Sequence, residues 1–123
     1  MKLVIMGSFP GLNEYINAER TNRYKAAAMK RQVEHTVTLA ARKCLGKKKF
    51  TRPVYMSYTW VEKNRRRDKD NVSSFGRKCI QDALVKGNWL DGDGWKHIVG
   101  FQDSFSVDAD HPKIEVEIEE VEG

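Results

Sequence analysis

The sequence has 123 residues, 40% of them hydrophobic and 32% charged, with 3 Pro and 9 Gly. This length accommodates one domain, residues 1–123, and the composition excludes disordered, collagen-like and membrane-spanning chains. Because 22 Lys and Arg stand against 17 Asp and Glu, the net charge is +5, and polyanions are the first partners to consider.

The positive charge is concentrated in the first 100 residues. Residues 101–123 contain eight acidic residues and one basic residue, Lys113, so this segment has a net charge of −7. Residues 1–100 therefore carry +12. We expect a polyanion to contact this first part of the chain rather than the last.

The sequence indicates neither export nor a thiol or histidine metal site. No stretch reaches the roughly 18 apolar residues that span a bilayer, and the apolar start Leu3–Met6 is shorter than a signal-peptide core of about 7–15 residues. Cys44 and Cys79 lie among apolar residues at helical spacing, which favours two free thiols over a disulfide. The three histidines form no zinc-ligand pattern. We expect an intracellular protein without a membrane partner.

The first half of the chain predicts a strand, a loop and a long helix. Lys2–Gly7 is a short β-branched run, and Ser8–Gly11 is typical of a loop. From Asn22 to Cys44 there is no Gly or Pro, and small or apolar residues recur every three or four positions. This spacing predicts a helix with one buried face, and the opposite face carries Lys and Arg.

The second half predicts a strand, a helix and two further strands. Val54–Val61 is rich in Val, Tyr, Thr and Trp, which are common in buried strands. A polar loop, Lys63–Asn71, leads into a helix over Val72–Lys86, whose apolar residues share one face. His97–Val107 and Lys113–Val121 alternate between apolar and polar residues, which predicts two strands, each with one wet face.

The order strand-helix-strand-helix-strand-strand predicts an α+β fold. We expect a small mixed β-sheet with both helices packed on one face and the last two strands paired as a closing hairpin. The sequence contains no internal repeat, linker or low-complexity segment.

Two clusters of acidic residues are candidates for chemistry. Asp68-x-Asp70 lies in a loop directly after three arginines, and Asp91-Gly92-Asp93 follows the second predicted helix. If these loops converge, their carboxylates offer the hard oxygen ligands that Mg²⁺ prefers, together with water and phosphate oxygens. Such a site would support phosphoryl chemistry, with neighbouring Arg and Lys binding the phosphodiester.

Each of these features also has a purely structural interpretation. Asp70 or Asn71 is placed to cap the following helix, and the composition of residues 91–94 is that of a tight turn. Lys78 can pair with Asp82 at i+4 on the helix surface. The individual motifs therefore leave both interpretations open.

Several motifs occur together, in a fixed order, over nearly the whole chain. They are Gly11–Tyr15 with Arg20 and Arg23, Arg67–Asn71, Phe75–Lys78, Gln81–Val85, Asp93–Lys96, Gly100-Phe101 and Pro112–Val116. In combination they resemble the RusA-like crossover junction endodeoxyribonucleases of phages and prophages.

The resemblance implies a homodimeric, Mg²⁺-dependent nuclease that resolves four-way (Holliday) DNA junctions by paired nicks in recombination and repair. Mn²⁺ is expected to substitute for Mg²⁺, and the expected location is the cytoplasm of a bacterial or phage-infected cell. Two alternatives stay open: a module that binds nucleic acid without cleaving it, and a related Mg²⁺ nuclease that acts on other branched DNA.

The resemblance also assigns roles to individual residues. Asp68 and Asp70 match the family's D-x-D-N acids, and Lys78 matches its helix lysine if this chain has a four-residue insertion. Without the insertion, Ser74 occupies the lysine position of shorter members.

A third acidic ligand is expected from the second cluster. Asp93 matches the family's acid before the next strand, and Asp91 is the alternative, because Gly92 separates two acids that are often adjacent in the family. The expected metal ligands are therefore Asp68, Asp70 and Asp93, with Lys78 near the scissile phosphate. We expect DNA to be contacted by Arg65, Arg66, Arg67, Lys69, Asn71, Arg77 and Lys96.

Overall fold

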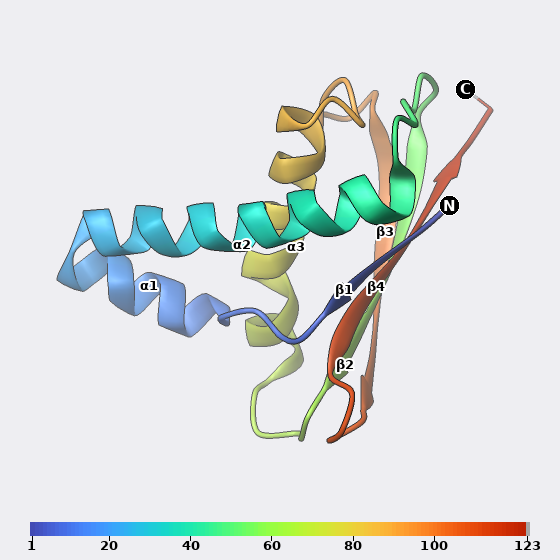
Figure 1. Ribbon diagram of the computed structural model, residues 1–123. Coiled ribbons are helices and arrows are strands. Elements are labelled where there is room, and N and C mark those ends of the chain that lie inside the picture. Colours follow the sequence, from blue (N-terminus) through green and yellow to red (C-terminus); the bar gives the residue numbers. More distant parts are fainter. Residues whose placement is uncertain (123) are drawn as a thin grey trace.

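The computed structural model describes residues 1–122, which form four strands and three helices (Figure 1). These are β1 (Lys2–Met6), α1 (Leu12–Thr21), α2 (Arg23–Leu45), β2 (Val54–Glu62), α3 (Lys69–Lys86), β3 (Ile98–Val107) and β4 (Lys113–Glu120). Every element predicted from the sequence is present, and its ends lie within three residues of the predicted ones.

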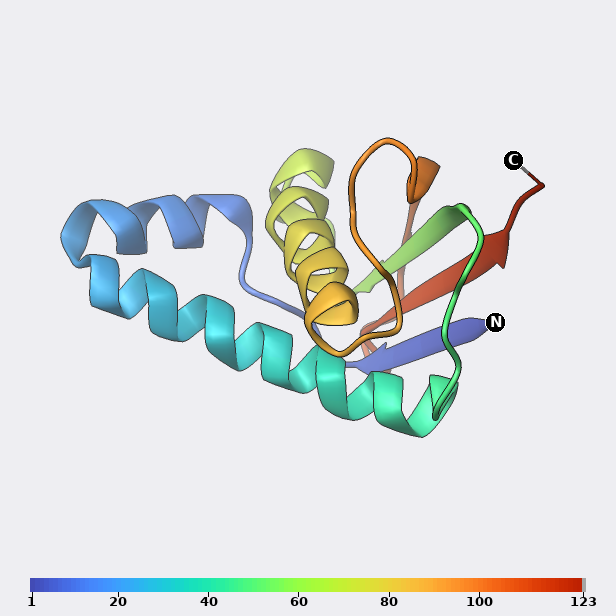
Figure 2. The same ribbon diagram turned by 90° about the horizontal axis from the view of Figure 1, so that it is seen from above.

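The strands form one mixed sheet in the order β1-β4-β2-β3, in which β2 runs antiparallel to β4 and parallel to β3. α2 and α3 lie on the same side of this sheet, and α1 packs against both of them (Figures 1 and 2). The predicted α+β fold, a mixed sheet with its helices on one face, is confirmed. Within residues 1–122, no helix combines the length and the apolar composition that crossing a bilayer requires.

The prediction that the last two strands pair as a hairpin is wrong. β2 lies between them, so Trp60 is opposite Ile114 of β4 on one side and Phe105 of β3 on the other. The connection between β3 and β4 crosses the end of β2, where the Asp108 N–H donates to the Glu62 carbonyl at 2.9 Å. Alternation in a sequence shows which face of a strand is wet, but it does not show which strand is the neighbour.

The helix α1 was not predicted. It has ten residues, which is too short for a stable isolated helix, and contacts from α3 support it. Asn71 Oδ1 accepts a hydrogen bond from the Asn13 N–H at 2.8 Å, which satisfies a donor in the first turn of α1. The Tyr15 ring stacks on Phe75 with a centroid distance of 4.4 Å. Because both partners are remote in sequence, local periodicity could not indicate this helix.

The core lies between the helices and the sheet, and in it α3 packs closely against β2. A Cβ at position 76 would lie 2.9 Å from the Trp60 ring and 3.2 Å from the Phe9 ring, so only Gly76 allows this approach. Trp60 Nε1 donates to Asp103 at 2.9 Å, and the same carboxylate binds Arg77 at 2.6 Å. These contacts fix the position of α3 relative to β2 and β3.

We expect Gly76→Ala to destabilise the fold by roughly 1–3 kcal/mol, because the added methyl group overpacks the contact with Trp60. Helix propensity alone would favour Ala over Gly by about 1 kcal/mol, so the sign separates the two effects. Urea denaturation of both proteins measures the difference. Gly94→Ala, where a Cβ meets no atom within 4 Å, is the control and should change stability little. Stabilisation by Gly76→Ala would contradict the packing argument.

Candidate functional site

The first acidic cluster lies at the N-terminus of α3. Asp68 occupies the N-cap position, but its side chain makes no capping hydrogen bond, and Asp70 lies in the first turn. The Ser74 hydroxyl donates to Asp70 Oδ1 at 2.7 Å, and both acidic residues are exposed. Neither Asp70 nor Asn71 is the N-cap of α3, so side-chain capping of this helix does not explain Asp68 or Asp70. Both carboxylates remain accessible to a ligand.

Three basic residues that are near this acidic pair in the sequence are not neutralised. Among residues 1–122, Arg65, Arg66 and Lys69 form no ion pair with a carboxylate, and all three are exposed. Lys69 Nζ lies 5.6 Å from the centroid of the Phe105 ring. The loop before α3 and its first turn therefore present positive charge to solvent next to two free carboxylates.

Arg67 has a different role from its neighbours. Its Nε and Nη2 donate to Glu62 Oε1 at 3.0 and 2.7 Å, and its Nη1 donates to the Phe9 carbonyl at 2.9 Å. Three groups of one guanidinium thus bind the end of β2 and the segment before α1. The sequence predicted Arg67 as a DNA contact, whereas the structure shows a side chain that holds the loop in place.

Asn71 and Arg77, also predicted as DNA contacts, have protein partners as well. Asn71 accepts from Asn13 as described above, and Arg77 binds Asp103 while its guanidinium carbon lies 4.5 Å from the Phe101 ring centroid. Both side chains therefore connect α3 to a neighbouring element. Their charge and position in the sequence could not distinguish this role from ligand binding.

The second acidic cluster lies in the loop after α3, at the opposite end of this helix from Asp68 (Figure 1). Asp91 pairs with Lys49 at 2.9 Å, and this hydrogen bond lowers the pKa of the Asp91 carboxyl. Asp93 lies 3.5 Å from Lys78 Nζ. Lys96 is exposed beside them. Asp91 thus pairs with Lys49, whereas Asp93 lies beside Lys78, the helix lysine that was predicted to lie near the scissile phosphate.

Lys78 connects Asp93 to a half-buried ion-pair network. Its Nζ lies 3.1 Å from Asp82, which is also bound by Lys30 at 2.8 Å. The hydrogen bond to Asp82, reinforced by Asp93, raises the pKa of Lys78. Partial burial alone would raise the pKa of Asp82, but the hydrogen bonds from Lys30 and Lys78 lower it. The predicted surface pair of Lys78 and Asp82 is therefore present, and Asp93 extends it.

The two acidic clusters do not meet within one chain. Asp70 and Lys78 are separated by about 12 Å along α3, at 1.5 Å per residue, and Asp93 lies at the tip of the Lys78 side chain. Two oxygen ligands of one Mg²⁺ lie within roughly 4 Å of each other. Within residues 1–122, no three His, Cys, Asp or Glu side chains are close enough together to hold a metal ion.

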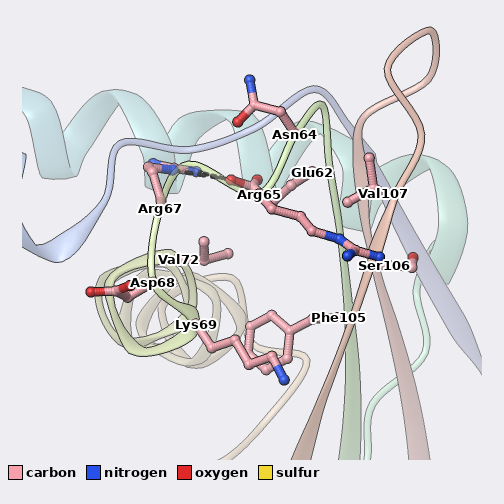
Figure 3. A pocket seen from close by; sticks show the side chains of 10 residues that line it. All are labelled: Glu62, Asn64, Arg65, Arg67, Asp68, Lys69, Val72, Phe105, Ser106 and Val107. Carbon is pink, nitrogen blue, oxygen red and sulfur yellow. Dashed lines mark hydrogen bonds and ion pairs between the residues drawn. The ribbon is translucent and has the colours of Figure 1, made fainter.

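A cavity of about 590 Å³ opens beside the basic loop, between the start of α3 and the end of β3 (Figure 3). Arg65, Lys69 and Phe105 line it. The two basic residues were predicted from the sequence as DNA contacts, but Phe105 was not, because an apolar residue in an alternating strand is usually part of the core.

A comparison with the models of known protein families found no match, and neither did a comparison with curated proteins.

We expect Asp82→Asn to destabilise the protein by roughly 1–2 kcal/mol at pH 7, because two lysines lose their shared partner. The lowered pKa of Asp82 means that its contribution is complete above the unfolded-state pKa of about 3.9 and disappears as pH falls through the folded-state pKa. Thermal melts between pH 7 and 3 measure this. The difference in Tm between wild type and Asp82→Asn should disappear below about pH 4. A difference in Tm that stays constant with pH would contradict the claim that the ionised Asp82 carboxylate stabilises the fold.

Proposed function

We propose that this chain is one subunit of a homodimeric, Mg²⁺-dependent endonuclease that resolves four-way DNA junctions by paired nicks. The observation that supports this most is the exposed pair Asp68 and Asp70, close in sequence to Arg65, Arg66 and Lys69, which pair with no carboxylate within residues 1–122. Cations attract a phosphodiester, whereas carboxylates repel it unless a divalent cation lies between them. The combination is therefore more useful to a metal-dependent nuclease than to a simple DNA-binding surface.

The donor set of the first cluster fits Mg²⁺ or Mn²⁺. Both ions prefer oxygen ligands, and Mg²⁺ commonly takes one or two carboxylates, with waters and phosphate oxygens completing its shell. Asp68 and Asp70 would hold the ion, and the Ser74 hydroxyl orients one carboxylate oxygen of Asp70. When bound, Mg²⁺ would stabilise negative charge on the phosphate and activate the attacking water.

The protein's own cations position the substrate around this pair. Arg65 and Arg66 would bind backbone phosphates of the DNA, since neither is committed to a carboxylate in the described part of the chain. Lys78 stays protonated because of its raised pKa, so it acts as a fixed positive charge and not as a general base. In this proposal it also orients Asp93 through their ion pair.

The separation of the two clusters requires a second subunit if Asp93 is to contribute. A two-fold axis perpendicular to α3 reverses the helix direction, so it can bring the partner subunit's Asp93 to Asp68 and Asp70. Each homodimer then contains two identical sites. A four-way junction has approximate two-fold symmetry, so two such sites match the two symmetric nicks that resolution in recombination and repair requires.

The charge distribution supports DNA binding on the helix side of the molecule. Ile114, Val116 and Ile118 of β4 are buried against the helices, so the intervening glutamates lie on the other face of the sheet. This agrees with the predicted outward position of the acidic C-terminal residues. The +12 charge of residues 1–100 is thus separated from most of the −7 charge of residues 101–123.

One observation favours a second candidate, a module that binds nucleic acid without cleaving it. Within residues 1–122 of a single chain no three-acid group forms, and a binding module needs none. Such a module would bind DNA with a strong salt dependence and without a requirement for Mg²⁺. A nuclease for flaps, forks or other branched DNA would share the metal site and differ only in substrate geometry.

We expect the purified protein to nick a labelled four-way junction symmetrically in Mg²⁺ and in Mn²⁺, and not in EDTA. Asp70→Asn should reduce cleavage by about 100-fold or more, since it removes a charged ligand. Glu119→Gln, an exposed change on the remote strand β4, is the control and should cleave like wild type.

The products identify which proposal holds. An intact junction with wild type, or equal cleavage by Asp70→Asn, would contradict the nuclease proposal. Binding without cleavage would support the non-catalytic module. Cleavage of flaps or forks in preference to four-way junctions would support a nuclease for other branched DNA. Comparing Asp91→Asn with Asp93→Asn tests the ligand choice, because only the latter should abolish cleavage.

A further inference from the structure

The cavity beside the basic loop opens away from the Asp68 carboxylate. Figure 3 shows that the Asp68 side chain, although it belongs to the rim, points its carboxylate away from the cavity. Arg65 reaches across from the loop toward the end of β3, and Lys69 runs alongside Phe105. The cavity thus lies on one side of the N-terminus of α3, and the Asp68 carboxylate points to the other.

The residues that line this cavity form an apolar part and a charged part. Val72 and Phe105 form an apolar floor, Val107 extends it, and Arg65 and Lys69 supply two cations at the mouth. The floor belongs to the hydrophobic core, because Val72 is buried and Phe105 packs against the core cluster. One wall is held rigid, since Arg67 and Glu62 bind each other. The cavity is therefore preformed on its apolar side.

This combination suits a ligand that has a flat apolar part and a negative charge. Its volume of about 590 Å³ lies within the usual range of about 300–1,000 Å³ for small-ligand pockets. Phe105 offers a ring on which a base can stack, and the two cations can bind the attached phosphate. A nucleotide has all of these parts in one unit.

We propose that this cavity binds one unstacked nucleotide of the DNA substrate, with its base against Phe105 and its phosphate on Arg65 and Lys69. The inference rests on the proposed function only in taking branched DNA as the ligand. Extruding a base from a continuous duplex breaks its pairing and its stacking on both sides, whereas opening the centre of a four-way junction exposes one face of each base there. The cavity therefore favours branched DNA over duplex, which the metal site alone cannot do.

Binding measurements with Ca²⁺ in place of Mg²⁺ test this inference without cleavage. Fluorescence anisotropy at one fixed salt concentration compares a labelled four-way junction with a duplex of the same sequence. We expect Phe105→Ala to weaken junction binding about tenfold and to leave duplex binding unchanged, because one base loses its stacking partner. Phe105→Leu should behave like Phe105→Ala, and Phe105→Tyr should retain wild-type affinity.

The matched control is Phe101→Ala, on the same strand but outside the cavity, which should retain the wild-type preference for the junction. If Phe105→Ala does not fold, Phe105→Leu carries the test, because it keeps the apolar volume without a ring. The proposal would be overturned if the Phe105 variant bound the junction as tightly as Phe101→Ala does, or if it lost as much affinity for the duplex as for the junction.

The two proposals fail differently. A wild-type protein that prefers the junction in Ca²⁺ but does not cleave it in Mg²⁺ would refute the nuclease and, with the expected Phe105 effects, support the nucleotide cavity. A wild-type protein without preference for the junction would overturn the cavity proposal whether or not it cleaves DNA.

Discussion

The rigid length of α3 is the constraint on which the arrangement of the site depends. A helix keeps its rise per residue, so side-chain motions cannot bring Asp70 in its first turn to Asp93 at the tip of Lys78. The helix itself is held firmly, because Gly76 lies against Trp60 in the core. A site that uses both acidic clusters must therefore be assembled between two chains, which links the proposed chemistry to dimerisation.

The contacts that fix the start of α3 also decide which basic residues face solvent. Arg67 binds Glu62 and the Phe9 carbonyl, so the middle of the basic run is anchored while Arg65 and Arg66 project outward. The loop can therefore keep one shape while two of its cations stay free for phosphate. One arginine of this run thus supports the loop while two stay exposed, as the proposed contacts with phosphate require, and the difference follows from which carboxylates lie within reach.

Much of the fold could be predicted because hydrophobic periodicity reports burial directly. The alternation in β4 and the spacing in α2 gave their faces correctly, whereas strand partners and the short helix α1 depend on contacts between remote residues. The acidic residues were found by motif, but their separation was not, because spacing along a chain does not fix distance across a helix. Phe105 was not predicted as a site residue, because only the structure shows that its ring borders a cavity.

The shared site is tested most directly by mixing two inactive subunits. In a heterodimer of Asp70→Asn and Asp93→Asn chains, one shared site carries both changes and the other carries neither. About half of randomly paired dimers are heterodimers with one intact site of two, so we expect about a quarter of wild-type nicking to return, as single nicks. If each site lay within one chain, every site would carry one change. A mixture as inactive as either variant alone, with heterodimers present, would contradict a site shared between subunits.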